Sequence, residues 1–185
     1  MFKRLKNFFF CLKYPFWKAR NVWTGKSCGY SFTEYDFIPE GWRKAFGKQL
    51  SKDLKKVLKK THYLKKFRFS QIKEKYGELC LYCFSAPEEV FEVLHKYELL
   101  SIGYCYICGK PARYCSKGWV AYVCEDCAKD FITDSKEREN CRLTKEDIPE
   151  CSTMVNDELV KVDLKKEYNI DFYKLWDLDE EDDSK

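Results

Sequence analysis

Two pairs of cysteines with matched spacing set the strongest condition on the fold of this chain. The first pair reads Cys105-Tyr-Ile-Cys108, fifteen residues follow, and the second pair reads Cys124-Glu-Asp-Cys127. Two residues between paired cysteines let a tight turn present both sulfurs to one ion, and two such pairs are typical of a four-cysteine zinc site. Zinc prefers four tetrahedral ligands and accepts soft thiolates. The sequence therefore predicts one structural Zn²⁺ per chain, bound by Cys105, Cys108, Cys124 and Cys127.

The segment around these pairs predicts a small module of its own, at residues 103–133. Residues 113–115 and 119–123 have the pattern of two short strands around a Ser-Lys-Gly turn, and residues 124–131 can form a helix. Gly109 follows the first pair, where the chain must bend sharply and a positive φ suits glycine. This order resembles a treble-clef or zinc-ribbon finger.

The donor set of this site bears on whether the protein is an enzyme. Four thiolates leave zinc no open position for water or substrate, so the ion should stabilise the fold and not catalyse. A metal-assisted nuclease, which is the alternative, would need a histidine beside the metal hairpin, and both His62 and His95 lie outside it. The sequence also lacks a P-loop, a glycine-rich dinucleotide turn and an HExxH motif. We therefore expect a non-catalytic protein with no small-molecule substrate.

Residues 41–102 predict an α+β layer. In residues 41–61 apolar side chains recur at three- and four-residue steps, as in an amphipathic helix, and a second apolar stripe follows a Ser-x-x-Glu capping box at Ser85. The first stripe contains Trp42, Phe46, Leu50, Leu54, Val57 and Leu58, and the second contains Val90, Phe91, Leu94 and Tyr97. Residues 67–75 and 78–84 read as strands joined at Tyr76-Gly77. The order helix, strand, strand, helix implies that both helices cover one face of a small antiparallel sheet.

Residues 1–40 form a basic, aromatic arm. A helical wheel places Phe2, Leu5, Phe8, Phe9 and Leu12 on one side. We expect this side to pack on the core, and an interfacial membrane helix or a partner-binding arm are the alternatives. The apolar run from Phe8 to Leu12 is shorter than the stretch of about 7 residues that a signal peptide needs, or the roughly 20 of a membrane span. We therefore expect a reducing cytosol and no membrane association.

The remaining cysteines give no comparable signal. The chain has 11 in all, and an odd number suits free thiols plus a metal site better than a full set of disulfides. Cys80 and Cys83 repeat the spacing of the zinc pairs, but residues three apart in a strand point to opposite faces. A second metal site that joins them to Cys141 and Cys151 is the alternative.

Charge is distributed unevenly along the chain. Residues 1–66 carry 17 Lys/Arg against 4 Asp/Glu, and residues 128–185 carry 10 against 18, although the net charge is only +4. The layout favours an acidic partner, either a protein or a nucleic acid, at the basic end. Lysines that could contact phosphates on the helix at 41–61 are Lys48, Lys52, Lys55, Lys56, Lys59 and Lys60. We expect an ordinary solvated helix face, which is the more common role of such lysines, and contact with phosphates is the alternative.

The acidic C-terminal segment, residues 134–185, ends in an aromatic stretch and a run of acids. The apolar residues Ile170, Phe172, Leu175, Trp176 and Leu178 precede the run that starts at Asp179. Such an end is either a last element that packs on the core or a docking peptide. The sequence favours the first.

Several strings resemble a group of small uncharacterised proteins of bacteriophages and gut-bacterial prophages. They are Gly29-Tyr-Ser-Phe-Thr-Glu, Gly41-Trp-Arg-Lys-Ala-Phe-Gly, Gln71-Ile-Lys-Glu-Lys-Tyr-Gly, Ala86-Pro-Glu-Glu-Val and Cys108-Gly-Lys-Pro-Ala. The resemblance covers about residues 29–128 and departs from the group at Cys80 and Cys83. It implies a phage or mobile-element origin and a bacterial host cytosol, and it carries no assigned activity. A host-directed inhibitor that occupies a protein surface is a further alternative.

Overall fold

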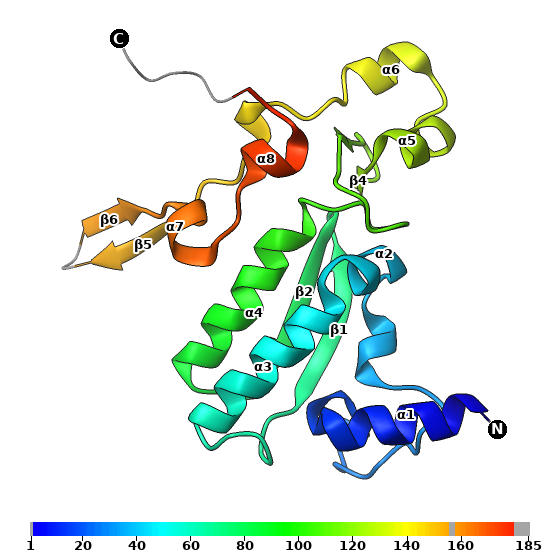
Figure 1. The fold of residues 1–185 in the computed structure, drawn as a ribbon, viewed down its shortest axis with the longest axis vertical. Coiled ribbons are helices and arrows are strands. Elements are labelled where there is room, and N and C mark those ends of the chain that lie inside the picture. The colour runs from blue at the N-terminus through cyan, green and yellow to red at the C-terminus, as the bar shows by residue number, and fades with distance from the viewer. Residues whose placement is uncertain (1, 156–157, 180–185) are drawn as a thin grey trace.

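The computed structural model describes residues 2–155 and 158–179 and has an α+β fold, as the sequence predicts. Its sheets are three separate antiparallel hairpins, β1-β2, β3-β4 and β5-β6. Figure 1 shows the helix and hairpin layer in the middle, helix α1 at one end and the cysteine-rich part at the other. Within the described ranges, no helix has the length and apolar character needed to cross a membrane.

The predicted helix at 41–61 is present, but a π-helical turn interrupts it. Short α2 (Glu40–Trp42) leads into the turn η3 (Arg43–Gly47) and then α3 (Lys48–Lys60). All six residues of the predicted stripe are buried, from Trp42 to Leu58. The wider turn has a partner from outside the helix, because the Tyr35 hydroxyl donates to the carbonyl oxygen of Arg43 at 3.4 Å.

The predicted hairpin pairs β1 (Phe69–Lys75) with β2 (Glu78–Cys83). Tyr76 and Gly77 both have positive φ, at 53° and 80°, which is the geometry of a tight two-residue hairpin turn. Phe69 and Ile72 of β1 and Leu79 and Leu81 of β2 are buried. As expected, α3 and α4 (Glu88–Ser101) lie side by side on one face of this hairpin (Figure 1).

Helix α4 also supplies hydrogen-bond acceptors to the free edge of the hairpin, along β2. The backbone N–H of Leu79 donates to Ser101 Oγ at 2.9 Å, and that of Leu81 donates to Glu98 Oε1 at 2.7 Å. An unpaired strand edge is thereby supplied with acceptors from a helix. Two details predicted for this helix are wrong. The N-cap is Pro87, without a side-chain hydrogen bond, and not Ser85 of a capping box; and Phe91, predicted in the buried stripe, is 47% exposed.

Helix α1 (Phe2–Lys13) forms, but the prediction that its apolar side packs on the core is wrong. Its one fully buried side chain is Cys11, and Phe10 packs against the core in part. The exposed apolar residues of the helix are Phe2, Leu5, Phe8, Phe9 and Leu12. The following turn η1 (Pro15–Trp17) instead supplies the main core with Phe16 and Trp17, which are both buried. A second such turn, η2 (Glu34–Phe37), then leads to α2.

The C-terminal part consists of short elements. They are β3 (Tyr114–Cys115), β4 (Tyr122–Val123), α5 (Glu125–Phe131), α6 (Ser135–Glu139), η4 (Lys145–Asp147), β5 (Ser152–Val155), β6 (Glu158–Lys161), α7 (Leu164–Tyr168) and α8 (Phe172–Trp176). Ile170, Phe172 and Trp176 are buried in a second core with Ile102 and Leu143. The aromatic end therefore packs on the protein, as the sequence favours. Most of the acidic run after it, residues 180–183, lies outside the described residues.

Candidate metal centre

The first cysteine pair lies on a tight turn. Tyr104 and Pro111 form an antiparallel bridge, and Cys105 donates its backbone N–H to the carbonyl oxygen of Lys110 at 2.8 Å. Gly109 closes the turn with φ +85° and donates to the carbonyl oxygen of Cys105 at 2.9 Å. We call residues 104–111 the cysteine turn. The glycine is needed here because side chains other than glycine rarely adopt this conformation.

The second pair lies where β4 leads into α5. Cys124 is the N-cap of α5, and Cys127 follows within its first turn. Hairpin β3-β4 connects the two pairs, with Tyr114 opposite Val123, and residues 141–143 run beside β3 through backbone hydrogen bonds to Cys115 and Arg113. The two cysteine pairs are thus brought to one point by the cysteine turn, hairpin β3-β4, helix α5 and residues 141–143.

The four predicted sulfurs meet at that point. All four Sγ atoms lie within 4.8 Å of one another, and Cys108 Sγ and Cys124 Sγ are 3.4 Å apart. A tetrahedral site with Zn–S bonds of about 2.3 Å has S–S separations of roughly 3.8 Å. Cys105 and Cys124 are buried, and all four cysteines are free of disulfides. The cluster can therefore bind a metal ion, and its spacing fits a tetrahedral one.

The electrostatics of the cluster favour a cation. Burial opposes ionisation of Cys105, yet its pKa is lowered because backbone N–H groups of Cys108, Cys124 and Ile107 donate to its sulfur. Burial raises the pKa of Cys108, and burial together with the neighbouring sulfurs of Cys124 and Cys108 raises the pKa of Cys127. Sulfurs this close do not all ionise unless a positive ion offsets their repulsion.

Comparison with protein-family models, with curated proteins and with solved structures gives no match to this chain.

The cysteine turn is held against helix α2, which the sequence did not indicate. Gly41 donates its N–H to the carbonyl oxygen of Tyr106 at 3.0 Å, and Trp42 Nε1 donates to the carbonyl oxygen of Tyr104 at 3.1 Å. The two backbones approach so closely that a Cβ at Gly109 would lie 2.5 Å from the carbonyl oxygen of Gly41. A glycine at the start of a helix is a weak signal of such an approach, because glycine is a poor helix former.

The turn of the β1-β2 hairpin makes a further contact with the module at residues 103–133, which we call the metal module. A Cβ at Gly77 would lie 3.0 Å from the ring of Tyr122 in β4. The cysteine cluster is thus attached to the α+β layer at two places, the start of α2 and the β1-β2 turn. A metal ion at the cluster would therefore stabilise more than the module itself.

The other cysteines and both histidines stand apart from the four sulfurs. Among the residues that the structure describes, those four are the group of three or more close metal-binding side chains that could hold an ion. Cys83 packs against the main core, Cys141 belongs to the buried apolar cluster that contains Cys105 and Cys124, and Cys151 packs on the second core. His62 follows α3, and His95 on α4 lies 3.9 Å from Glu98.

The lysines predicted to contact phosphates divide into two groups. Lys48, Lys52, Lys56, Lys59 and Lys60 are exposed along α3. Lys55 is half-buried, because its Nζ donates to the carbonyl oxygen of Lys13 at 2.7 Å and lies over the Tyr14 ring. Lys55 therefore fastens the end of α1 to α3, a role that its place in a lysine-rich helix did not indicate.

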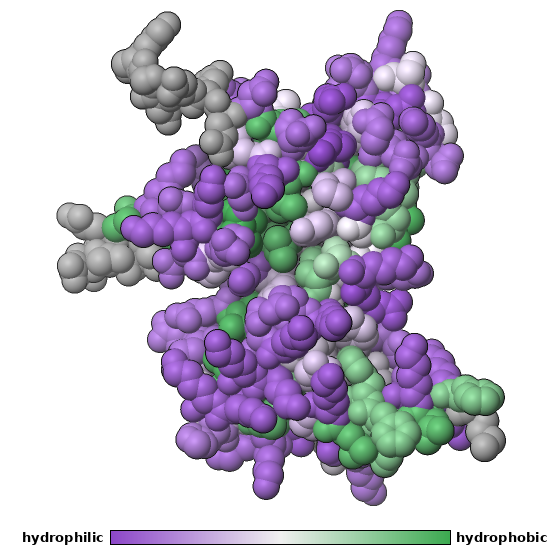
Figure 2. Space-filling view, in the orientation of Figure 1, coloured by the Kyte–Doolittle hydropathy of each residue, from purple (hydrophilic) through white to green (hydrophobic). Residues whose placement is uncertain are grey.

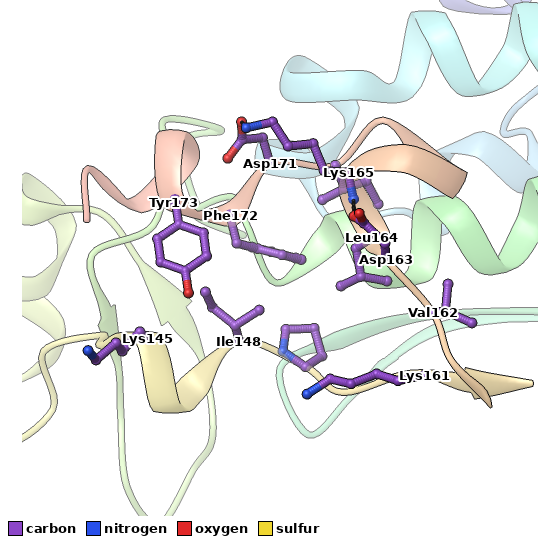
Figure 3. A pocket seen from close by; sticks show the side chains of 12 residues that line it. Lys145, Ile148, Lys161, Val162, Asp163, Leu164, Lys165, Asp171, Phe172 and Tyr173 are labelled. Atoms are coloured by element: carbon purple, nitrogen blue, oxygen red, sulfur yellow. Dashed lines mark hydrogen bonds and ion pairs between the residues drawn. The ribbon is translucent and has the colours of Figure 1, made fainter. Parts of the chain in front are cut away.

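A separate open cleft of about 430 Å³ lies between the chain before β5 and the last two helices. Figure 3 shows Ile148, Leu164 and Phe172 at its apolar part, with Lys165 and Asp171 at its rim. Lys165 Nζ and an Asp171 oxygen are 2.9 Å apart, and the hydrogen bond and charge of Lys165 lower the pKa of Asp171. None of the four clustered cysteines lines this cleft.

Proposed function

We propose that the protein is a non-catalytic binding module whose fold is stabilised by one Zn²⁺ at Cys105, Cys108, Cys124 and Cys127. The observation that carries this proposal is the convergence of four free sulfurs within 4.8 Å. The order of cysteine turn, hairpin β3-β4 and helix α5 supports a treble-clef or zinc-ribbon arrangement. Four thiolates complete a tetrahedral shell, so the ion would supply folding energy and hold the turn on α2.

The partner in this proposal is an acidic protein or a nucleic acid, bound in the cytosol of a bacterial host by a protein of phage or mobile-element type. Five exposed lysines on α3 support it, because they form one side of a helix whose opposite side is buried. A metal-assisted nuclease is less well supported, since neither histidine lies in the cysteine cluster. A host-directed inhibitor that covers a protein surface would use the same basic side.

Binding to single-stranded DNA tests the nucleic-acid form of this proposal. Replacing Lys52, Lys56 and Lys59 with glutamate should lower the affinity at low salt at least tenfold and flatten the dependence of log affinity on log salt by about 2, since each lost phosphate contact contributes about 0.7. Fluorescence anisotropy titrations at several salt concentrations measure both quantities. Lys55 is left unchanged because it fastens α1.

The matched control replaces three exposed lysines within residues 128–185, Lys129, Lys136 and Lys166, with glutamate. This triple variant has the same net charge as the first and should lose no more than about twofold in affinity if binding is local to α3. Equal losses in the two variants, or no binding by the wild-type protein at low salt, would rule out a nucleic-acid site on α3 and leave a protein as the partner.

A further inference from the structure

The outward side of helix α1 is an exposed apolar surface. It consists of Phe2, Leu5, Phe8, Phe9 and Leu12, which we call the α1 apolar face. Their side chains are exposed to 91%, 55%, 36%, 60% and 64%. At 100° per residue they span an arc of roughly 120°, the width of a complete amphipathic stripe. Figure 2 shows these residues gathered in green over α1, at the lower right of the molecule.

The helix is fixed with most of this face pointing away from the protein. Phe8, at one border of the face, packs edge-on against the ring of Tyr30 at 5.2 Å. Asn7 Nδ2 donates to the carbonyl oxygen of Tyr30 at 2.9 Å, and the ring of Phe10 packs against Tyr14 and Tyr35 at 5.5 Å and 5.2 Å. Cys11 is buried beside them, and Lys55 binds the last carbonyl of the helix. The attached side is nearly opposite the α1 apolar face, so the face cannot turn inward without breaking these contacts.

Positive charge surrounds the face. The first 33 residues hold seven Lys/Arg and no Asp/Glu, and the first turn of α1 has no acidic residue. On the helical wheel Lys6 and Lys13 lie along one border of the face and Arg4 lies along the other. Long basic side chains at the borders of an apolar stripe can extend their charged ends while their stems cover apolar surface.

We propose that α1 is an interfacial helix that binds the surface of an anionic lipid bilayer. A basic helix with one apolar side, too short to span, lies in the plane of the headgroups with that side among the acyl chains. Its flanking lysines and arginine then meet anionic headgroups, which give the cytoplasmic leaflet its negative surface potential. The expectation of no membrane association rested in part on packing this face against the core, and the exposed face removes that basis.

The charge and the apolar character of the α1 apolar face favour a lipid bilayer over a second copy of the chain or a nucleic acid as its binding partner. A second copy on the same face would bring two acid-free basic segments together, and juxtaposed like charges oppose association. A nucleic acid would neutralise the basic side chains, but it would give the leucines and the outward phenylalanines no apolar environment. An anionic bilayer is complementary to both features at once.

A neighbouring turn adds an anchor of the expected kind. Trp23 is 92% exposed at the tip of a turn in which Asn21 accepts from the backbone N–H of both Trp23 and Thr24. Cys28 lines two shallow clefts, one shared with Leu5 and Phe8 of α1 and the other shared with Trp23. The turn and the helix therefore adjoin, and tryptophan is enriched at membrane interfaces.

Flotation of the full zinc-loaded protein with lipid vesicles tests the proposal. The wild-type protein should float with vesicles containing about one third phosphatidylglycerol and at least tenfold less with pure phosphatidylcholine, because the attraction is partly electrostatic. The variant Leu5→Glu with Phe9→Glu should lose at least tenfold in binding. The variant Leu5→Ser with Phe9→Ser, which leaves the net charge unchanged, should lose most of it as well.

The matched control is Phe84→Glu with Phe91→Glu, which alters two apolar side chains of similar exposure, 62% and 47%, outside α1. It should float as the wild-type protein does, apart from a small loss from its added charge. Equal losses in the glutamate variants of the two sites would overturn the proposal. So would wild-type protein that fails to float. If that protein is dimeric by light scattering and the α1 variants are monomeric, the face joins two copies of the chain instead.

Discussion

Replacing Cys105 with serine is expected to release the metal ion and unfold the cysteine-rich part of the protein. Cys105 is fully buried, and its sulfur accepts backbone N–H groups from both pairs, so it lies at the centre of the cluster. Because the free energy of binding zinc in such sites is largely folding free energy, the loss should amount to several kcal/mol. Chelation of the metal from the wild-type protein should have the same effect.

Hydrogen exchange followed by mass spectrometry locates this effect. Amides of residues 105–128 should lose protection in Cys105→Ser. Those of α3 should remain protected, because the buried residues of the main core around Leu50, Leu54 and Leu58 all come from residues 14–97. The pattern of lost protection distinguishes local unfolding of the metal module from unfolding of the whole chain.

Cys141→Ser is the matched control, because Cys141 is buried in the same apolar cluster as Cys105 but is not among the four sulfurs. A hydroxyl in that apolar place should cost about 1 to 3 kcal/mol and leave the metal bound. The assignment of the ligands is wrong if Cys141→Ser loses the metal ion as Cys105→Ser does, or if Cys105→Ser keeps one metal ion per chain.

Replacing Gly41 with alanine is expected to destabilise the protein and weaken its hold on the metal. A Cβ there would lie 2.5 Å from the carbonyl carbon and oxygen of Tyr106 and closer still to the carbonyl oxygen of Cys105. These are backbone atoms, so they cannot rotate away, and α2 or the cysteine turn must shift at a cost of about 1 to 3 kcal/mol. The direction of the change in stability is informative, because alanine in a helix otherwise stabilises by roughly 1 kcal/mol relative to glycine.

Gly47→Ala makes the same substitution further along the same helix. Its Cβ would meet the ring of Tyr35 and no part of the cysteine turn. Denaturant unfolding and competition with a zinc indicator should show lower stability and lower zinc affinity for Gly41→Ala, but unchanged zinc affinity for Gly47→Ala. Zinc affinity unchanged in both variants would mean that docking on α2 does not support the metal site.

The parts of the fold that follow from local periodicity could be predicted. The stripe from Trp42 to Leu58 is buried as expected because one helix must cover one core, and the Tyr76-Gly77 turn sets the register of its hairpin. The convergence of Cys105, Cys108, Cys124 and Cys127 could be predicted because paired cysteines at this spacing suit a single ion.

The parts that depend on distant residues could not be predicted. The pattern in α1 identifies its apolar side, but it does not say whether the core has room for it, and in the structure the core takes Phe16 and Trp17 instead. The contact of Gly41 with the cysteine turn joins two distant segments and leaves no periodic trace. Likewise, the tail shows its apolar residues without showing that Trp176 would pack on Ile102 and Leu143.

The metal content of the purified protein tests the central claim most directly. Protein expressed with zinc available and dialysed against metal-free buffer should carry one zinc ion per chain, by elemental analysis and by the mass of the intact protein under native conditions. The ion should depart when the cluster is altered at Cys105 or Cys127 and stay when Cys80 is replaced with serine. A protein that carries no metal, that carries two ions per chain, or that loses its zinc in Cys80→Ser would contradict a single structural zinc at these four cysteines.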